Sequence, residues 1–425
     1  MKPEDLARLA DDSRFEATPE IVSRARGAML ASACGDALGV PYEFAAPTDS
    51  PEMIGGGLGP YEPGEWSDDT QMAICIAKVA AKGVSLTSEP ALDLVGERFL
   101  DWLAGGASDV GTQTRAVLAH AAEAGRGDVS DRLHEAADEF SARTDRAAGN
   151  GALMRTTPVG LAFPGSRMRT AKAAKAMARL THYDPLVDQS CILWTEAIRH
   201  ALTTGRADVR AGLDLLDAQA RDYWAKAVDD AEAGAFSAHQ NGFTVVALQC
   251  AWHAVFSVRD LAGERAVRTG LVNAVSLGGD TDTVAAIAGG LLGAAHGDKC
   301  FSTAAVLTDG DKVVLSYLDE LQFMPKDSAS GVPNSDKKLG ENYAEGQVLA
   351  SKRVNAEYYS GLMKEKAQAT KRIDEGYDAI QKAADGKTVI EIDSMAGEEK
   401  ADAVSGATLK DSANYLKLIE EAAES

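Results

Sequence analysis

Two short clusters of acidic residues lie about two hundred residues apart in this sequence. Residues 67–70 read SDDT, and residues 280–283 read DTDT behind two glycines. Each cluster leads directly into an apolar segment with helical spacing. A single Asp or Ser would suffice to cap such a helix, and it would contribute about 1 kcal/mol. The remaining carboxylates would repel one another unless a positive charge lies between them.

A hard divalent cation is the natural candidate for that charge. The side chains in both clusters offer only oxygen atoms, and neither cluster contains Cys or His. These are the ligands that Mg²⁺, Mn²⁺ and Ca²⁺ prefer. If the two clusters face each other in the fold, they would form a metal site that could hold two ions. The alternative for either cluster alone is a helix cap with solvated neighbours, but two clusters of the same pattern favour metal binding.

Composition excludes several functional classes. The chain has 425 residues and a formal net charge of −21, which argues against sequence-independent binding to nucleic acid or anionic membranes. The longest small apolar run, residues 284–295, is too short to span a bilayer. The first 17 residues contain no apolar segment typical of a signal peptide. The five cysteines occur singly, which indicates free thiols in a reducing compartment. We therefore expect a cytoplasmic protein.

The sequence predicts two domains, 1–297 and 298–425. The first is rich in Ala, Leu and Gly, and its periodicity predicts an all-α domain. The predicted helices span residues 26–37, 70–82, 91–104, 112–124, 169–181, 188–204, 209–232, 242–255, 261–277 and 283–295. The second domain is predicted to be α+β, with a hairpin around residues 309–311 and a loop at 325–340. Further elements are helices within 343–384, a strand at 387–392 and a helix at 409–424.

Three further motifs of the first domain could contribute to a site. Residues 35–44 (GDALGVPYEF) end a helix in a Gly/Pro turn that carries two acids. Residues 149–155 (GNGALMR) form a Gly-flanked loop whose backbone N–H groups could receive a phosphate, although such a loop is more often only a turn. His182 ends another helix within THYDP, where a lone His is more often a cap or a surface residue than a catalyst.

Taken in order, five segments resemble the ADP-ribosylglycohydrolase family over about residues 20–297. They are GDALGVPYEF, GEWSDDTQMA, GNGALMRTTP, THYDP and GGDTDTVAAIAGGLLGA. The resemblance implies an all-α fold that holds two Mg²⁺ or Mn²⁺ ions in its helical bundle. It also implies hydrolysis of the glycosidic bond between ADP-ribose and a protein side chain, or a related small ADP-ribosyl conjugate.

The resemblance assigns roles residue by residue. The metal ligands would be Ser67, Asp68, Asp69, Asp280, Asp282 and Thr283, with Ser67 in a position that usually holds Thr. Glu43 matches an acidic residue near the metals, and Asp36 would be structural or lie behind the ligands. Gly149, Asn150 and Gly151 match the segment against the diphosphate and distal ribose, and His182 matches a histidine of the same pocket.

This assignment agrees with the chemistry of the bond. The cis hydroxyls of a ribose can replace water around a hard cation, which fixes the sugar as the anomeric bond loosens. A carboxylate such as Asp69 or Glu43 could deprotonate the attacking water. The sequence does not choose between these two carboxylates, between Mg²⁺ and Mn²⁺, or among the possible acceptor groups.

The second domain contains the heptad DAVSGAT at residues 402–408. Its simplest interpretation is a Gly turn followed by a helix cap. The heptad also resembles the D-x-x-S-G-A-T motif of FMN-binding domains, in which a flavin transferase esterifies FMN phosphate to the Thr. This resemblance makes Thr408 the attachment site, with Gly406 and Ala407 allowing close approach of the phosphate. A natural fusion, an engineered chimera and a descendant without flavin are all compatible with the sequence.

Three other functions are compatible with the motifs. The chain could bind ADP-ribose or a nucleotide without hydrolysis, but its full set of acidic residues argues against this. It could be a flavoprotein whose second domain carries electrons and whose first domain regulates it. A purely structural helical scaffold would leave both acidic clusters unexplained.

Overall fold

The computed structural model describes residues 15, 17–144, 146–261, 263–297, 301–332, 347–367, 371–397 and 412–424. The chain divides into two compact units, Met1–Asp298 and Lys299–Ser425. Each unit is described by itself. None of the described helices is long and apolar enough to cross a membrane. The four described cysteines are free thiols: Cys34 and Cys75 are half-buried, and Cys191 and Cys250 are buried.

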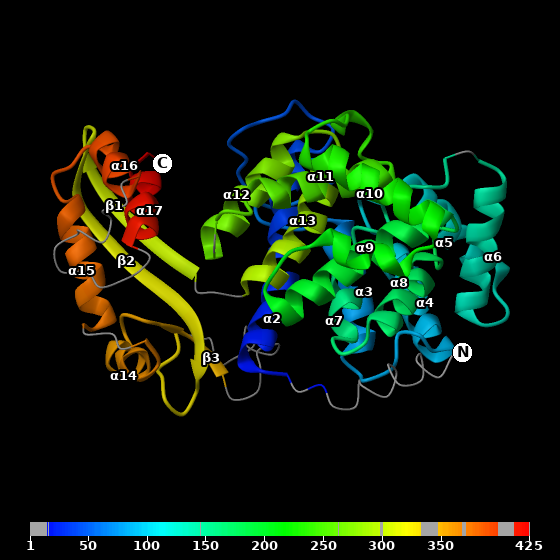
Figure 1. Ribbon diagram of the computed structural model, residues 1–425, viewed down its shortest axis with the longest axis horizontal. Helices are drawn as coiled ribbons and strands as arrows, with labels where there is room; N and C mark the ends of the chain where they lie inside the picture. Colours follow the sequence, from blue (N-terminus) through cyan, green and yellow to red (C-terminus); the bar gives the residue numbers. More distant parts are fainter. Residues whose placement is uncertain are drawn as a thin grey trace. The chain divides into compact units, whose positions relative to one another are not determined.

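The first unit is mostly helical, as the sequence predicts (Figure 1). Its α-helices are α2 (Pro19–Gly39), α3 (Asp68–Ala80), α4 (Glu89–Ala104), α5 (Thr112–Ala124), α6 (Val129–Ala142), α7 (Thr157–Ala162), α8 (Arg167–Ala178), α9 (Pro185–Thr204), α10 (Ala218–Glu232), α11 (Thr244–Ser257), α12 (Gly263–Ser276) and α13 (Thr281–His296). Three short 3₁₀ helices are η2 (Val40–Tyr42), η3 (Val209–Leu215) and η4 (Ala238–Gln240).

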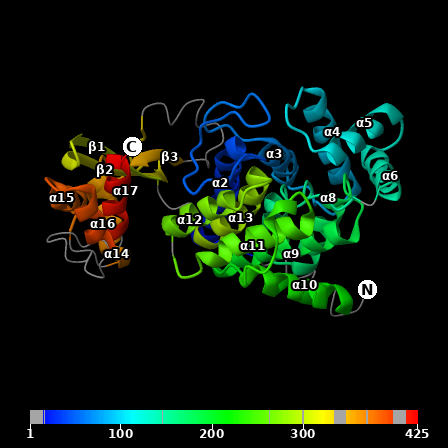
Figure 2. The same cartoon turned by 90° about the horizontal axis from the view of Figure 1, so that it is seen from above.

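Helix α13 lies at the centre of this unit. Every residue from Thr281 to Ala295 is buried, and helices α2, α9, α11 and α12 pack around it (Figure 2). Helix α2 packs on it most closely, because three glycines along the contact bring the two backbones together. A Cβ atom at Gly35, Gly289 or Gly293 would overlap a carbonyl oxygen of the opposite helix. This contact places the end of α2 directly against the start of α13.

Four details of the first unit differ from the sequence prediction. Helix α2 begins at Pro19, seven residues before the expected start at residue 26. The helix expected over 209–232 is divided into η3 and α10, because Asp217 caps a new helix by accepting a hydrogen bond from Ala220 N at 3.0 Å. The other two differences are helices α6 and α7, which the prediction missed.

The second unit contains a three-stranded antiparallel sheet in the order β1–β2–β3. Strands β1 (Phe301–Asp309) and β2 (Lys312–Pro325) form the expected hairpin, and β3 (Gln347–Ser351) pairs with the end of β2. The helices are α14 (Ala356–Ala367), α15 (Ile373–Ala384), α16 (Val389–Gly397) and α17 (Ser412–Glu424). The core of this unit is formed by side chains from the sheet, α15 and α17, including Val313, Leu318, Tyr377, Ile380, Leu416 and Ile419.

Two predictions for the second unit were wrong. The strand expected at 387–392 is largely the start of helix α16. Thr388 and Glu391 form a reciprocal capping box: Thr388 N donates to Glu391 Oε2 at 2.9 Å, and Glu391 N donates to Thr388 Oγ1 at 3.2 Å. The helical stretch expected within 343–384 begins instead with strand β3. The heptad at 402–408, with Gly406, Ala407 and Thr408, lies outside the described residues.

The close contact between α2 and α13 can be tested with Gly289→Ala. The added methyl would overlap the carbonyl of Ala31, and neither backbone can move aside easily. We expect a loss of about 3 kcal/mol in the free energy of unfolding of the first unit. All five tryptophans lie in this unit, so Trp fluorescence during urea unfolding measures its stability separately. Gly242→Ala is the control, because no atom lies within 4 Å of its added Cβ. Equal stability of the two variants would contradict the close contact.

Candidate metal centre

Helices α3 and α13 begin at the two acidic clusters, and both have unusual caps. Ser67 and Asp280 occupy the N-cap positions, yet neither side chain makes the capping hydrogen bond to its own helix. In α3 the bond comes from another helix: Asp36 of α2 accepts from Thr70 N at 2.9 Å and from Ser67 N at 2.8 Å. The side chains at both helix starts are therefore available for other contacts.

Three carboxylates meet at these helix starts. One oxygen from each of Asp36, Asp69 and Asp282 lies within 4.8 Å of the other two, and all three residues are buried. The Ser67 hydroxyl lies among them, 2.7 Å from Asp36 Oδ1, 3.1 Å from Asp69 Oδ2 and 3.4 Å from Asp282 Oδ2. The second oxygen of Asp69, Oδ1, is buried and has no hydrogen-bond partner. A buried carboxylate oxygen normally has one, so this atom is a ready ligand for a cation.

A second group of carboxylates shares Asp282 with the first. Glu43, Asp109 and Asp282 each place one oxygen within 4.8 Å of the other two. Glu43 and Asp109 are only half-buried, so this group lies closer to solvent. Two oxygen-rich groups with a common carboxylate have the donor set that a pair of Mg²⁺ or Mn²⁺ ions requires. The residues present therefore fit such ions.

The electrostatics of the site also favour a cation. Burial raises the pKa of Asp69 and Asp282 well above the ordinary range, and the charges of neighbouring carboxylates raise both further. Burial and the charges of Asp280 and Asp109 raise the pKa of Glu43 to about 9. Among the described residues, no Lys or Arg forms an ion pair with any of these carboxylates. A bound divalent ion would supply the missing positive charge.

Asp68, Asp280 and Thr283 were also expected as ligands, but they belong to neither of these two groups of three carboxylates. Burial raises the pKa of Asp68 well above its ordinary range, and the charges of Asp109, Asp36 and Asp280 add to the effect. These acids therefore lie within electrostatic reach of one another. Burial raises the pKa of Asp280 overall, although hydrogen bonding with Asn150 and, to a smaller extent, with Thr283 lowers it.

The turn after α2 positions Glu43. The Thr281 hydroxyl donates to Gly39 O at 2.8 Å, and a Cβ at Gly39 would overlap the backbone of Asp282, so α2 ends against the start of α13. Phe44, next to Glu43, has a positive φ of 52°, which is strained for a bulky residue. Its N–H donates to Gly279 O at 2.7 Å. This hydrogen bond holds the strained turn in place, so that Glu43 stays beside the acidic cluster at residues 280–283.

The loop at residues 149–151 reaches the same site. The Asn150 amide donates to Asp280 Oδ2 at 2.7 Å and to Asn241 O at 3.0 Å. Asn241 in turn accepts from Asp280 N at 3.0 Å. Two asparagines therefore fix the backbone and the carboxylate of Asp280. The backbone N–H of Asn150 donates to Gly242 O at 3.0 Å, so this N–H is already used within the protein.

His182 lies underneath that loop and is fully buried, so it is not a surface residue. Its ring faces both glycines: a Cβ at Gly149 would lie 3.3 Å from Nε2, and one at Gly151 would lie 3.2 Å from Cε1. Burial and the nearby charge of Arg155 lower the pKa of His182 to about 3, so the ring is neutral. Arg155 donates to Thr181 Oγ1 at 2.7 Å, and this hydroxyl lies 2.7 Å from His182 Nδ1. Thr181 can therefore donate to Nδ1, which leaves the proton of the ring on Nε2, toward the glycines.

Sequence reasoning missed one residue and underestimated another. Asp109 is a single Asp in the loop before α5, and it carries no local signal in the sequence. Asp36 was expected to be structural or to lie behind the ligands. It does anchor α3, but one of its oxygens also belongs to the buried group with Asp69 and Asp282.

Comparison with known proteins identifies similar chains. The family model for ADP-ribosylglycohydrolases matches residues 17–318. ADP-ribosyl-[dinitrogen reductase] glycohydrolase of Rhodospirillum rubrum is 30% identical over 288 residues, covering 66% of this chain and 87% of the relative. ADP-ribosylarginine hydrolase Tri1 of Serratia proteamaculans is 26% identical over 290 residues, covering 65% of this chain and 73% of the relative. A solved structure of an ADP-ribosylglycohydrolase-related protein complex aligns with a TM-score of 0.49 and 29% identity, covering 66% of this chain and 90% of that one.

Asp282→Asn tests whether the shared carboxylate holds cations. Mg²⁺ or Mn²⁺ should raise the Tm of the wild-type first unit, because an ion at a hundred times its Kd stabilises by about 2.7 kcal/mol. The variant should lose this rise. Without metal it should be at least as stable as wild type, since it removes one of several repelling charges and its amide oxygen can still accept from Thr283 N.

The measurement is thermal unfolding followed by Trp fluorescence, with and without chelator. Asp138→Asn is the matched control, because it removes the same charge from an exposed position on α6. A metal-induced rise that survives in Asp282→Asn, or no rise in wild type, would contradict the assignment.

Proposed function

The chain belongs to the ADP-ribosylglycohydrolase family of hydrolases, and from that premise we propose that it releases ADP-ribose from ADP-ribosylated protein side chains or related small conjugates. The buried group of Asp36, Asp69 and Asp282 is the observation that carries this proposal. It lies within the matched region and provides an oxygen donor set for a divalent ion. ADP-ribosyl-arginine is the first substrate to test, because a relative is named as a hydrolase of that conjugate.

We assign Mg²⁺ or Mn²⁺ to the two groups that share Asp282. Asp36, Asp69 and Ser67 would hold one ion, and Glu43 and Asp109 would contribute to the other, with Asp68, Asp280 and Thr283 beside them. When bound, such ions orient the hydroxyls of a ribose and stabilise negative charge on oxygen. The asparagine pair Asn150 and Asn241 keeps Asp280 in a fixed orientation toward this centre.

Of the two candidate bases, position favours Glu43 over Asp69. Asp69 is 1% exposed, whereas Glu43 is half-buried and lies in a turn that borders solvent. A water molecule that attacks the anomeric carbon enters from solvent, so its general base must be within reach of solvent. The hydrogen bond from Phe44 N to Gly279 O holds this turn in place. We therefore propose that Glu43 accepts the proton of the attacking water; bound cations would offset the neighbouring carboxylates that raise its pKa and would keep it ionised.

The loop of Gly149, Asn150 and Gly151, together with His182, is proposed to hold the ADP-ribose. The small glycines let a ligand approach the backbone closely. The neutral ring of His182 directs Nε2–H toward this loop, so it supports the loop from beneath without bringing a charge. Substitution of either glycine by a larger residue would press on the His182 ring.

The hydrolase proposal predicts chelator-sensitive release of ADP-ribose from ADP-ribosyl-arginine. Replacing Asp68 and Asp69 together by Asn should lower kcat/KM by at least about a hundred-fold, because a catalytic metal supplies several kcal/mol. Glu43→Gln should lower kcat by about the same factor while KM changes little. Glu52→Gln, an exposed acid of the same loop, is the control.

Release of free ADP-ribose is measured by chromatography, with either metal and then with chelator. Full activity of the Asp68/Asp69 double variant would contradict the metal-dependent mechanism. Tight binding of ADP-ribose with no hydrolysis of arginine, serine or small-molecule conjugates would instead support a binding module.

We also propose that Thr408 carries FMN, added by a flavin transferase, as the motif at residues 402–408 suggests. The support is the sequence heptad itself, followed by helix α17 and preceded by the hairpin β1–β2. Such a group would make the second unit an electron carrier attached to the hydrolase. The proposal does not depend on the metal centre.

Co-expression with a flavin transferase tests this second proposal. The wild-type chain should remain yellow after denaturation and gel filtration, because an ester bond survives unfolding. Thr408→Ala should be colourless, whereas Ser405→Ala, which removes another hydroxyl of the same motif, should stay yellow. A colourless wild-type chain would overturn covalent attachment.

A further inference from the structure

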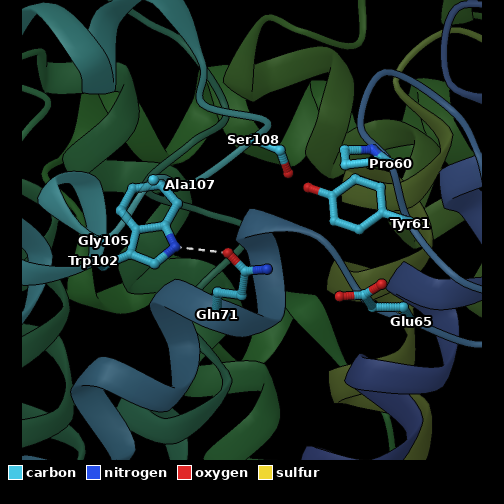
Figure 3. A pocket seen from close by; sticks show the side chains of 9 residues that line it. Pro60, Tyr61, Glu65, Gln71, Trp102, Gly105, Ala107 and Ser108 are labelled. Carbon is cyan, nitrogen blue, oxygen red and sulfur yellow. Dashed lines mark hydrogen bonds between the residues drawn. The ribbon is translucent and has the colours of Figure 1, made fainter.

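An open pocket of about 440 Å³ lies beside the metal centre and plays no part in the proposed hydrolysis. It is formed by the loop before α3, the first turn of α3, the end of α4 and the loop that follows α4 (Figure 3). Its lining includes Tyr61, Glu65, Gln71, Trp102 and Ser108. The pocket is not lined by any of the seven acids at the metal centre, which are Asp36, Glu43, Asp68, Asp69, Asp109, Asp280 and Asp282.

The lining offers one carboxylate and two aromatic rings. Trp102 Nε1 donates to Gln71 Oε1 at 2.6 Å, which fixes the indole and uses its N–H. Glu65 Oε2 accepts from Glu62 N at 2.8 Å, which holds that carboxylate in place. In Figure 3 Trp102 and Glu65 lie on opposite sides of Gln71, and the Tyr61 hydroxyl points toward Ser108. The lining contains no Lys, Arg or His.

Tyr61 lines the pocket and lies near the acids. It is 7% exposed, and Ser108 next to it immediately precedes Asp109 of the metal centre. Burial raises the pKa of the Tyr61 hydroxyl, and the charges of Asp109 and Asp68 raise it further. The pocket therefore lies within the negative field of the metal centre. A field of this sign attracts cations and repels phosphates and carboxylates.

We propose that this pocket binds a lysine or arginine side chain that flanks the modified residue of a protein substrate. The proposal rests on the proposed function, since it concerns how a protein conjugate is presented to the same centre. A cationic head group would meet the Glu65 carboxylate and the faces of Tyr61 and Trp102, which together attract a flat or tetrahedral cation. The volume is ample for one long side chain and accompanying water.

The geometry favours a flanking residue over the modified residue itself. The acids do not line the pocket, so a group in the pocket is displaced from the bond that is cleaved. An extended peptide advances about 3.3–3.6 Å per residue, so a neighbour two or three positions away can reach such a displaced site. The same loop also exposes apolar side chains suited to contact with a protein: Ile54 and Leu58 are each 58% exposed, and Trp66 is 41% exposed.

Hydrolysis of matched substrates tests the pocket. The substrates are free ADP-ribosyl-arginine and two ADP-ribosyl-arginine peptides that differ only in Lys or Gln at the flanking positions. In wild type the Lys-flanked peptide should have a KM about five-fold lower than the Gln-flanked peptide. Glu65→Gln should remove this preference and leave free ADP-ribosyl-arginine unaffected. Its amide oxygen can still accept from Glu62 N, so the loop should keep its shape. Glu97→Gln, an exposed acid on α4, is the matched control.

Each result decides for or against the pocket. Equal KM values for the two peptides in wild type would overturn the proposal. The proposal would also be overturned if Glu65→Gln raised the KM for free ADP-ribosyl-arginine as much as the KM for the Lys-flanked peptide. The pocket would then hold the modified residue itself. If no conjugate is hydrolysed, the proposed function fails, and calorimetric binding of the same two peptides to wild type and Glu65→Gln decides the pocket independently. Indistinguishable affinities would then overturn it.

Discussion

Repulsion among buried carboxylates is the constraint on which the first unit depends. Asp36, Asp68, Asp69, Asp280 and Asp282 are each at most 9% exposed, and they gather where α3 and α13 begin. The positive ends of two helix dipoles and a few hydrogen bonds favour their charge, but neither provides a full positive charge. In a low-dielectric interior such a cluster is costly unless a cation joins it. Without a cation the cluster therefore lowers the stability of the fold, and with one it could form a metal site.

The surrounding structure keeps these carboxylates in place. Asp36 caps α3 from a different helix, which leaves the Ser67 hydroxyl among the acids instead of bonded to the backbone of its own helix. Glycines bring α2 against α13, so the turn that carries Glu43 ends beside Asp282. The loop of Asn150 holds Asp280 from the other side. Each of these contacts acts at a helix terminus, where a small displacement of the backbone would move the carboxylate oxygens apart.

The sequence could predict the parts of this arrangement that are encoded locally. The long apolar periodicities predicted most helices, the mostly helical fold was confirmed, and the two acidic helix starts were visible as clusters. Asp109 could not be found, because only the folded chain brings it to Glu43 and Asp282. The position of Asp36 within the carboxylate group could not be predicted either, because it depends on a contact with Ser67, 31 residues away in the sequence. The short apolar run at 387–392 wrongly predicted a strand, because a short run of this kind occurs in helices as well. The capping box of Thr388 and Glu391 favours a helix there.

Equilibrium dialysis against Mn²⁺ tests the central claim most directly, because it counts ions without reference to substrate. Asp282 belongs to both carboxylate groups, so its loss should affect both ions. The account predicts two Mn²⁺ ions bound per wild-type chain and loss of both high-affinity sites in Asp282→Asn. A wild-type chain that binds no Mn²⁺, or a variant that binds two ions as tightly as wild type, would contradict it.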